Sequence, residues 1–201
     1  MSIQKIKRKT KETDISILLD MHSTEEPKIQ TTLPFFDHIL HSMAYHGGFS
    51  LQIVASGDTH VDPHHLVEDT GLVLGDALLS LAGDSKGISR YGHAVIPMDD
   101  ALSEVCIDAC GRSYLVYRAD YPQDRSGTFD MWLIREFLLA LSKRARANIH
   151  ALCRYGENSH HMAESLFKAV GIALCQAYTR IDSLSRSTKG VLYNDLSENG
   201  G

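Results

Sequence analysis

The chain has 201 residues, of which 43% are hydrophobic and 22% charged, and its formal net charge is −5. This composition is that of a globular protein with a sizeable core. The acidic balance gives no reason to expect a nucleic-acid partner. The first residues are basic without the apolar run of a signal peptide, and no apolar stretch approaches the roughly 20 residues that span a bilayer. We therefore expect a cytoplasmic protein without membrane contact, whose four cysteines are free thiols.

The first half of the chain predicts a run of strands interrupted by two helices. Short segments of alternating or β-forming residues predict strands at residues 5–10, 14–20, 28–33 and 49–57. One helix is expected to begin at Pro34, because proline is favoured in a first helical turn. A longer helix is expected over residues 63–82, with Asp62 as its N-cap.

The second half repeats this order. Strands are predicted at residues 93–99, 103–110, 113–120 and 148–156, and helices at 129–147 and 159–178. Each half therefore has the pattern βββαβα, and since neither half covers its own sheet, we expect both to pack as one α+β body. Its architecture would be two four-stranded sheets with the helices packed between them. We place the first repeat at residues 1–85, the second at 86–190 and a flexible tail at 191–201.

The motif His-His-x-x-Glu occurs twice, 96 residues apart, at the start of the last helix of each half. Residues four apart share one face of a helix, so His64 and Glu68 are able to bind one ion together. His65 is rotated by about 100° and points away from that ion. The copy at residues 160–164 repeats the arrangement. Adjacent surface histidines would explain one such motif, but two copies at equivalent places of a repeat favour metal ligands.

A duplicated fold allows each ion to take the His–Glu pair of one motif and the second histidine of the other. One site would contain His64, Glu68 and His161. Its mirror would contain His160, Glu164 and His65. The second histidine could belong to the same chain or to a neighbouring one. Imidazole and carboxylate ligands without thiolate suit Mn, Fe, Co or Zn rather than a structural cysteine–zinc site.

The helix that begins at Pro34 carries three more histidines. His38 is the best candidate for a further ligand, because it stands at the repeat position of Glu136, which is another possible ligand. His41 is equally well explained as an exposed helix residue, and His46 lies one turn beyond it.

Six segments carry a resemblance to a known family: FFDHILHSMAYHG, GDTHVDPHHLVEDTGLVLGDAL, KGISRYGHAVIPMDDAL, DACGRSYLV, GENSHHMAESLFKAVGIAL and STKGVL. Through them the sequence resembles the imidazoleglycerol-phosphate dehydratases, in the monofunctional form without a fused phosphatase domain. The resemblance implies a duplicated βββαβα fold and a hydro-lyase of histidine biosynthesis. Such an enzyme dehydrates D-erythro-imidazole glycerol phosphate to imidazole acetol phosphate through a metal-bound imidazolate.

The resemblance also implies two Mn²⁺ ions per active site. One would be bound by His38, His65, His160 and Glu164. The other would be bound by His64, Glu68, His161 and Glu136. Many family members have histidine at the position of Glu136; a carboxylate also suits Mn²⁺, but it would change the strength of that site.

Catalytic and substrate-binding residues follow from the same resemblance. Glu12 lies at the position of the acid/base glutamate, and the catalytic set is completed by the ligands His38, Glu68 and Glu164. Substrate binding is implied for Glu12, His46, Arg90, Arg112, Lys168, Ser187, Thr188 and Lys189. Guanidinium, ammonium and hydroxyl donors suit a phosphate monoester. Arg186 replaces a proline that many relatives have before the STKG segment.

The resemblance implies self-association into trimers and a 24-subunit shell, with metal sites at the subunit contacts and a small phosphorylated molecule as substrate. Two other functions are consistent with parts of the sequence. A non-catalytic metal-binding assembly of the same fold would keep the ligands but would not need the substrate-binding set. A dinuclear metallohydrolase would require more carboxylate ligands, bridging ions about 3.5–4 Å apart.

Overall fold

The computed structural model describes residues 3–83 and 87–181. The elements of the first half are β1 (Gln4–Lys9), β2 (Thr13–Asp20), β3 (Lys28–Gln30), α1 (Pro34–Gly47), β4 (Ser50–Gly57) and α2 (His64–Ala82). Those of the second half are β5 (Tyr91–Met98), β6 (Ala101–Asp108), β7 (Tyr114–Arg118), β8 (Arg125–Ser126), β9 (Phe129–Asp130), α3 (Leu133–Ala145), β10 (Asn148–Tyr155) and α4 (Ser159–Tyr178).

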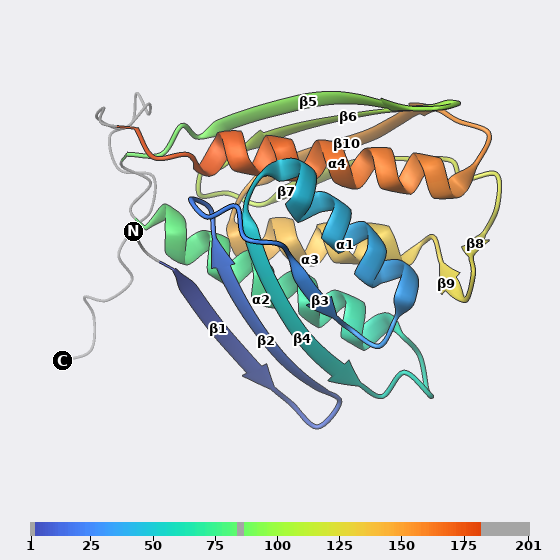
Figure 1. The fold of residues 1–201 in the computed structure, drawn as a ribbon, viewed down its shortest axis with the longest axis horizontal. Helices are drawn as coiled ribbons and strands as arrows, with labels where there is room; N and C mark the ends of the chain where they lie inside the picture. Colours follow the sequence, from blue (N-terminus) through green and yellow to red (C-terminus); the bar gives the residue numbers. More distant parts are fainter. Residues whose placement is uncertain (1–2, 84–86, 182–201) are drawn as a thin grey trace.

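Two four-stranded sheets enclose a layer of helices, as Figure 1 shows. The strand orders are β1-β2-β4-β3 and β5-β6-β10-β7, so the second sheet repeats the first. In each sheet the last pair, β4 with β3 or β10 with β7, is parallel, and the other pairs are antiparallel. The α+β architecture predicted from the repeat is therefore confirmed.

The core lies between the sheets and the helices. In β2, Ile15, Ile17 and Leu19 alternate with more exposed residues and are completely buried, so one face of this strand meets the helix layer. Across the layer, Phe36 and Phe137 meet edge to face, with 5.4 Å between their ring centroids. Each sheet packs on the helices of its own half, and those helices bury their other faces against the helices of the other half, so the two halves share one hydrophobic core.

The helices pair across the two halves: α1 packs against α4, and α2 packs against α3. All four helices begin at the same end of the molecule (Figure 1). Glycines allow this close packing, because a Cβ atom on Gly171 would lie only 1.9 Å from the carbonyl oxygen of Met43. The same crossing brings the first turns of α1 and α4 side by side, and these turns carry histidines.

Gly171→Ala is expected to lower the free energy of unfolding by roughly 1–3 kcal/mol, the usual cost of overpacking. The added Cβ would meet the backbone of α1, which cannot rotate away as a flexible side chain would. Thermal denaturation at fixed protein concentration measures the change. Gly57→Ala is the control, because its Cβ would have no neighbour closer than 3.2 Å. Equal melting temperatures for the two variants would contradict close α1–α4 packing.

The prediction that a helix begins at residue 129 was wrong, because α3 begins at Leu133. Phe129 and Asp130 form β9 and pair with β8, so the second half carries a short hairpin that the first half lacks. The reason is burial: the Phe129 ring stacks on Phe36 across the layer, with centroids 5.8 Å apart. Helix α2 begins at His64, one residue later than predicted, so its N-cap is Pro63 and the prediction of Asp62 as the N-cap was wrong. The Asp62 side chain still accepts a 2.7 Å hydrogen bond from the backbone N–H of His64.

Among residues 3–83 and 87–181, no helix has the length and apolar character needed to cross a bilayer. All four cysteines lie within these ranges and are free thiols.

Candidate metal centre

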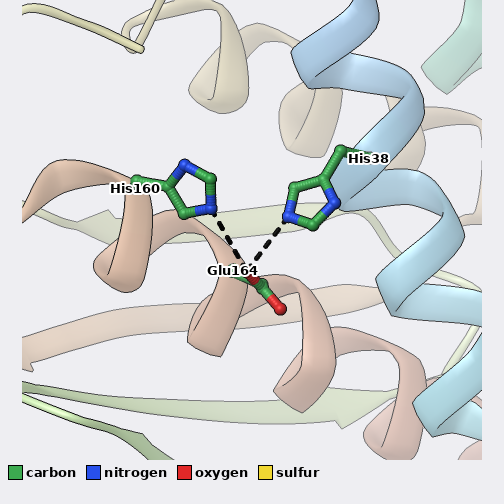
Figure 2. A group of neighbouring side chains, drawn as sticks. All are labelled: His38, His160 and Glu164. Atoms are coloured by element: carbon green, nitrogen blue, oxygen red, sulfur yellow. Dashed lines mark hydrogen bonds and ion pairs between the residues drawn. The ribbon is translucent and has the colours of Figure 1, made fainter.

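Three side chains that are distant in sequence converge at the start of α4 (Figure 2). One carboxylate oxygen of Glu164, Oε2, lies 3.0 Å from Nε2 of His38 and 3.3 Å from Nε2 of His160. These three residues form a group whose ligand atoms all lie within 4.8 Å of one another. Two imidazole nitrogens and a carboxylate oxygen are donors that Mn, Fe, Co and Zn accept.

Local sequence explains why these residues meet. The Asn158 side chain caps α4 by accepting a 2.9 Å hydrogen bond from the backbone N–H of His160. Glu164 follows one turn later on the same face. His38 comes from the first turns of α1, which the close α1–α4 packing places opposite.

The Glu164 carboxylate is ionised and well held. Only 12% of its side chain is exposed, and its second oxygen accepts a 2.9 Å hydrogen bond from Nζ of Lys168. Burial on its own would raise the pKa of Glu164, but the hydrogen bonds from Lys168 and His38 outweigh burial and lower the pKa to about 2. A negative ligand is therefore available to a cation at every physiological pH.

The first motif shows the same helical pair in a looser form. Nε2 of His64 lies 3.5 Å from Oε2 of Glu68. The indole of Trp132, half exposed at the start of α3, stacks on His64 with ring centroids 5.5 Å apart. Glu136 forms an ion pair with Arg135 at 2.9 Å, and the described residues bring it into no three-donor group with the first motif.

Glu136 is nevertheless the repeat equivalent of His38. Helices α1 and α3 both end in a left-handed residue, Gly48 with φ 72° and Arg146 with φ 50°, which stand 98 residues apart. The same spacing relates His38 to Glu136. Since α3 packs on α2 as α1 packs on α4, Glu136 belongs to the helix that faces the first motif.

The second histidine of each motif is held by an aspartate. Nδ1 of His65 lies 3.2 Å from both carboxylate oxygens of Asp58, and Nδ1 of His161 lies 2.5 Å from Asp100. The Asp58 hydrogen bond raises the pKa of His65, although burial opposes it. The hydrogen bond from His161, followed by those from two backbone N–H groups, holds the pKa of Asp100 well below its usual range. A carboxylate on Nδ1 leaves Nε2 available to a metal.

Sequence reasoning missed Asp58 and Asp100. Their signal was weak: Asp58 directly follows β4 and Asp100 lies in the turn between β5 and β6, where aspartate is common without any function. Only the fold brings each one to its histidine.

Asp58→Asn and Asp100→Asn are each expected to weaken cation binding by roughly 10–100-fold, the usual effect of losing an outer partner of a ligating histidine. The amide neither orients the imidazole as firmly nor raises its basicity. Metal content after dialysis against graded chelator measures the effect. Asp14→Asn is the matched control, because Asp14 is an exposed aspartate whose ion-pair partner is Lys9 rather than a histidine. Equal metal retention in all three variants would contradict this role.

The crossed ligand sets predicted from the sequence are not assembled within a single chain. Among the described residues, neither His65 nor His161 belongs to a three-donor group. Of the predicted set His38, His65, His160 and Glu164, the described chain brings together all but His65.

The predicted substrate-binding residues fall into separate places. Glu12 lies in the β1–β2 turn, with Oε2 4.0 Å from Nδ1 of His65, beside a shallow cavity of about 330 Å³. Lys168 contacts Glu164, and burial together with the Lys168 charge lowers the pKa of His46 on α1. Ser187, Thr188 and Lys189 lie outside the described residues.

The two predicted arginines do not reach the His38 cluster. The backbone N–H of Arg90 donates to Ala177 at the end of α4, 17 residues after His160, a distance of about 25 Å along the helix. The Arg90 side chain forms a two-pronged ion pair with Asp108, at 2.6 and 3.1 Å. Arg112 follows Asp108, the last residue of β6, by four residues and is exposed.

Comparisons with known proteins find relatives over almost the whole chain. The family model described as imidazoleglycerol-phosphate dehydratase matches residues 31–174. The imidazoleglycerol-phosphate dehydratase of Geobacter sulfurreducens is 49% identical over 190 residues, which is 93% of this chain and 97% of that protein. The crystal structure of the enzyme from Pyrococcus furiosus in complex with (S)-C348 superposes with a TM-score of 0.81 at 36% identity, covering 93% of this chain and all of that one.

The enzyme from Staphylococcus aureus gives a TM-score of 0.77 at 38% identity, covering 89% of this chain and 99% of the other. The relatives are thus matched over nearly their whole length, in both halves of the fold. The chain belongs to the imidazoleglycerol-phosphate dehydratase family.

Proposed function

We propose that this chain is a hydro-lyase of histidine biosynthesis, acting in the cytoplasm, that removes water from imidazole glycerol phosphate to give imidazole acetol phosphate. The observation that carries the proposal is the pair of His-His-x-x-Glu motifs at equivalent helix starts, in a chain of this family. Oε2 of Glu164 accepts a hydrogen bond from Nε2 of His38 at 3.0 Å and lies 3.3 Å from Nε2 of His160, so three potential ligand atoms already lie close together.

The donor sets fit two Mn²⁺ ions per active site. One ion would take His38, His65, His160 and Glu164, and the other His64, Glu68, His161 and Glu136. No thiolate is among these ligands, and imidazole and carboxylate are donors that Mn²⁺ accepts. When bound, the cations would supply Lewis acidity and a template for the imidazole ring of the substrate.

The sites would be completed between subunits, in trimers that build a 24-subunit shell. Two observations support this. His65 and His161 stay outside the three-donor groups of the described chain. Arg90 lies at the far end of α4 from His160. A phosphate held by Arg90 and Arg112 of one copy would therefore belong to a substrate whose ring meets the cluster of another. The division of the chain into a first repeat at residues 1–85 and a second at residues 86–190 also stays a proposal.

Each side chain then has a stated task. Dehydration removes a proton from one carbon and a hydroxyl group from the next, so a base and a proton donor are needed. Glu12 is exposed and stands beside His65, so its carboxylate would move the proton of the glycerol chain. Lys168 holds Glu164 in place, and with His46 and the residues at 187–189 it would bind the polar end of the substrate.

Glu12→Gln is expected to lower kcat by roughly 10²–10⁴-fold, the share of general acid–base catalysis, while both cations stay bound. The measurement is formation of the enol product from imidazole glycerol phosphate by Mn²⁺-loaded protein, with metal content determined in the same sample. Glu25→Gln is the control, because Glu25 lies in the exposed segment before β3. Full turnover of the Glu12 variant with metal bound would remove Glu12 from this role.

The same assay separates the main alternative, a non-catalytic metal-binding assembly. That protein would bind Mn²⁺ and assemble without forming product. The retention of Glu12, Arg90, Arg112, Lys168 and Lys189 favours the enzyme. Product formation that stops on chelation and returns with Mn²⁺ is the expected result; none at any metal concentration would sink the proposed function.

A further inference from the structure

The outer face of the second sheet carries a second group of potential ligands, far from the helix starts. His93 on β5 and Cys106 on β6 are directly opposite each other in the antiparallel register. Glu104 precedes Cys106 by two residues and therefore projects from the same face. The ligand atoms of these three side chains all lie within 4.8 Å of one another. Such spacing is already close to that around a bound cation.

The carboxylate of this group is oriented by a neighbour. Arg154 on β10 donates from Nε to Oε2 of Glu104 at 2.8 Å, while Oε1 lies 3.4 Å from Nε2 of His93. Arg154 and, less strongly, His93 lower the pKa of Glu104, so the carboxylate is ionised. The guanidinium thus holds one oxygen as an outer partner and leaves the other pointing at the imidazole, as in metal sites whose ligands are fixed from behind.

The donors define the class of cation. Cysteine sulfur, histidine nitrogen and glutamate oxygen together are ligands of zinc, whereas Mn²⁺ has little affinity for sulfur. We infer that His93, Glu104 and Cys106 form a site for a thiophilic divalent cation of the zinc class, with water in the fourth position. The site is separate from the proposed catalytic metals and does not depend on them. Coordination would release the Cys106 proton to solvent, leaving a neutral set of Zn²⁺, thiolate and carboxylate.

The consequence for the fold is a link between two strands. β5 is the edge strand of its sheet. The backbone N–H of His93 donates a 2.9 Å hydrogen bond to the side-chain oxygen of Gln176 on α4. A cation bound by His93 and Cys106 would tie this edge to β6 from the outer side. Zinc is therefore expected to raise the melting temperature of the protein by mass action, and Cys106→Ser is expected to remove that increase.

Cobalt gives a test that the catalytic metals cannot imitate. Mn²⁺-loaded protein is titrated with Co²⁺, and the near-ultraviolet thiolate-to-cobalt charge-transfer absorption is followed. The band is expected in the unaltered chain, is expected to disappear on adding Zn²⁺, and is expected to be absent in Cys106→Ser. His93→Ala should weaken Co²⁺ binding by at least the roughly 10–100-fold that loss of an outer partner costs.

Cys175→Ser is the matched control, because Cys175 is a half-buried thiol on α4 outside the cluster. It is expected to keep the band. Dehydratase turnover with Mn²⁺ is expected to be unchanged in the His93, Cys106 and Cys175 variants, which separates this site from the proposed function. No band in the unaltered chain at saturating Co²⁺ would overturn the inference. A band that persists in Cys106→Ser would overturn it too, since the sulfur would then come from another cysteine.

Discussion

Glu164→Gln is expected to lower kcat by about 10³-fold, roughly 4 kcal/mol of transition-state stabilisation, and to remove one of the two proposed cations. The amide has the shape of the carboxylate but no charge. It would leave the ammonium of Lys168, 2.9 Å away, without its counter-charge and directed at the cation site. Cation binding would then lose an anionic ligand and meet a positive neighbour. Metal analysis and turnover on the same sample measure both effects.

Glu26→Gln is the matched control for this variant. Glu26 also accepts a hydrogen bond from an imidazole, Nε2 of His41, at 3.0 Å, but it lies on the surface and belongs to no three-donor group of the described residues. It is expected to keep two cations and full turnover. If Glu164→Gln retained both cations, the convergence of His38 and His160 on that carboxylate would be an ordinary ion-pair cluster.

Two inactive variants, Glu164→Gln and His65→Ala, are expected to restore activity when they are co-expressed. Each retains what the other has lost. If a site takes the His38 cluster from one copy and His65 from another, random assembly leaves both parts intact in about a quarter of the sites. Co-expression should therefore give about 25% of the turnover of the unaltered protein.

The control mixes Glu164→Gln with His160→Ala, two changes in the same cluster. Every site in that mixture has a damaged cluster, so no recovery is expected. Recovery in neither mixture, with subunit exchange verified by mass spectrometry, would mean that His65 and Glu164 act within one chain. That result would contradict completion of the sites between subunits, while leaving the assignment of the individual ligands open to the single variants.

Hydrophobic periodicity was sufficient to predict the helices and most strands, because each pattern of apolar and polar residues occurs in both halves of the chain. Alternation in β2 and the cap before α4 are local features that a sequence displays directly. The start of α3 was not predictable in this way. Phe129 fits a helical pattern, but its ring stacks on Phe36 of the other half. Residues 129 and 130 therefore form a hairpin strand because of a contact that exists only in the assembled core.

The residues of the candidate site likewise fall into those that local sequence predicts and those that only the folded chain brings together. The His64–Glu68 and His160–Glu164 pairs follow from helix geometry alone. The meeting of His38 with Glu164 depends on the α1–α4 packing, and Asp58 and Asp100 become meaningful only beside their histidines. The predicted roles of these residues stay predictions until the variants are measured, and Ser187, Thr188 and Lys189 lie outside the described residues.

The exchange of helix partners between the halves sets a minimum size for this architecture. α1 and α2 belong to one half, yet each finds its main helical neighbour in the other. A protein made of only one half could rebuild the layer solely by joining a twin about a two-fold axis, with α1 lying on the twin's α2. Joining two such copies end to end turns that dimer into one polypeptide and frees each copy's side chains to diverge, as His38 and Glu136 have done.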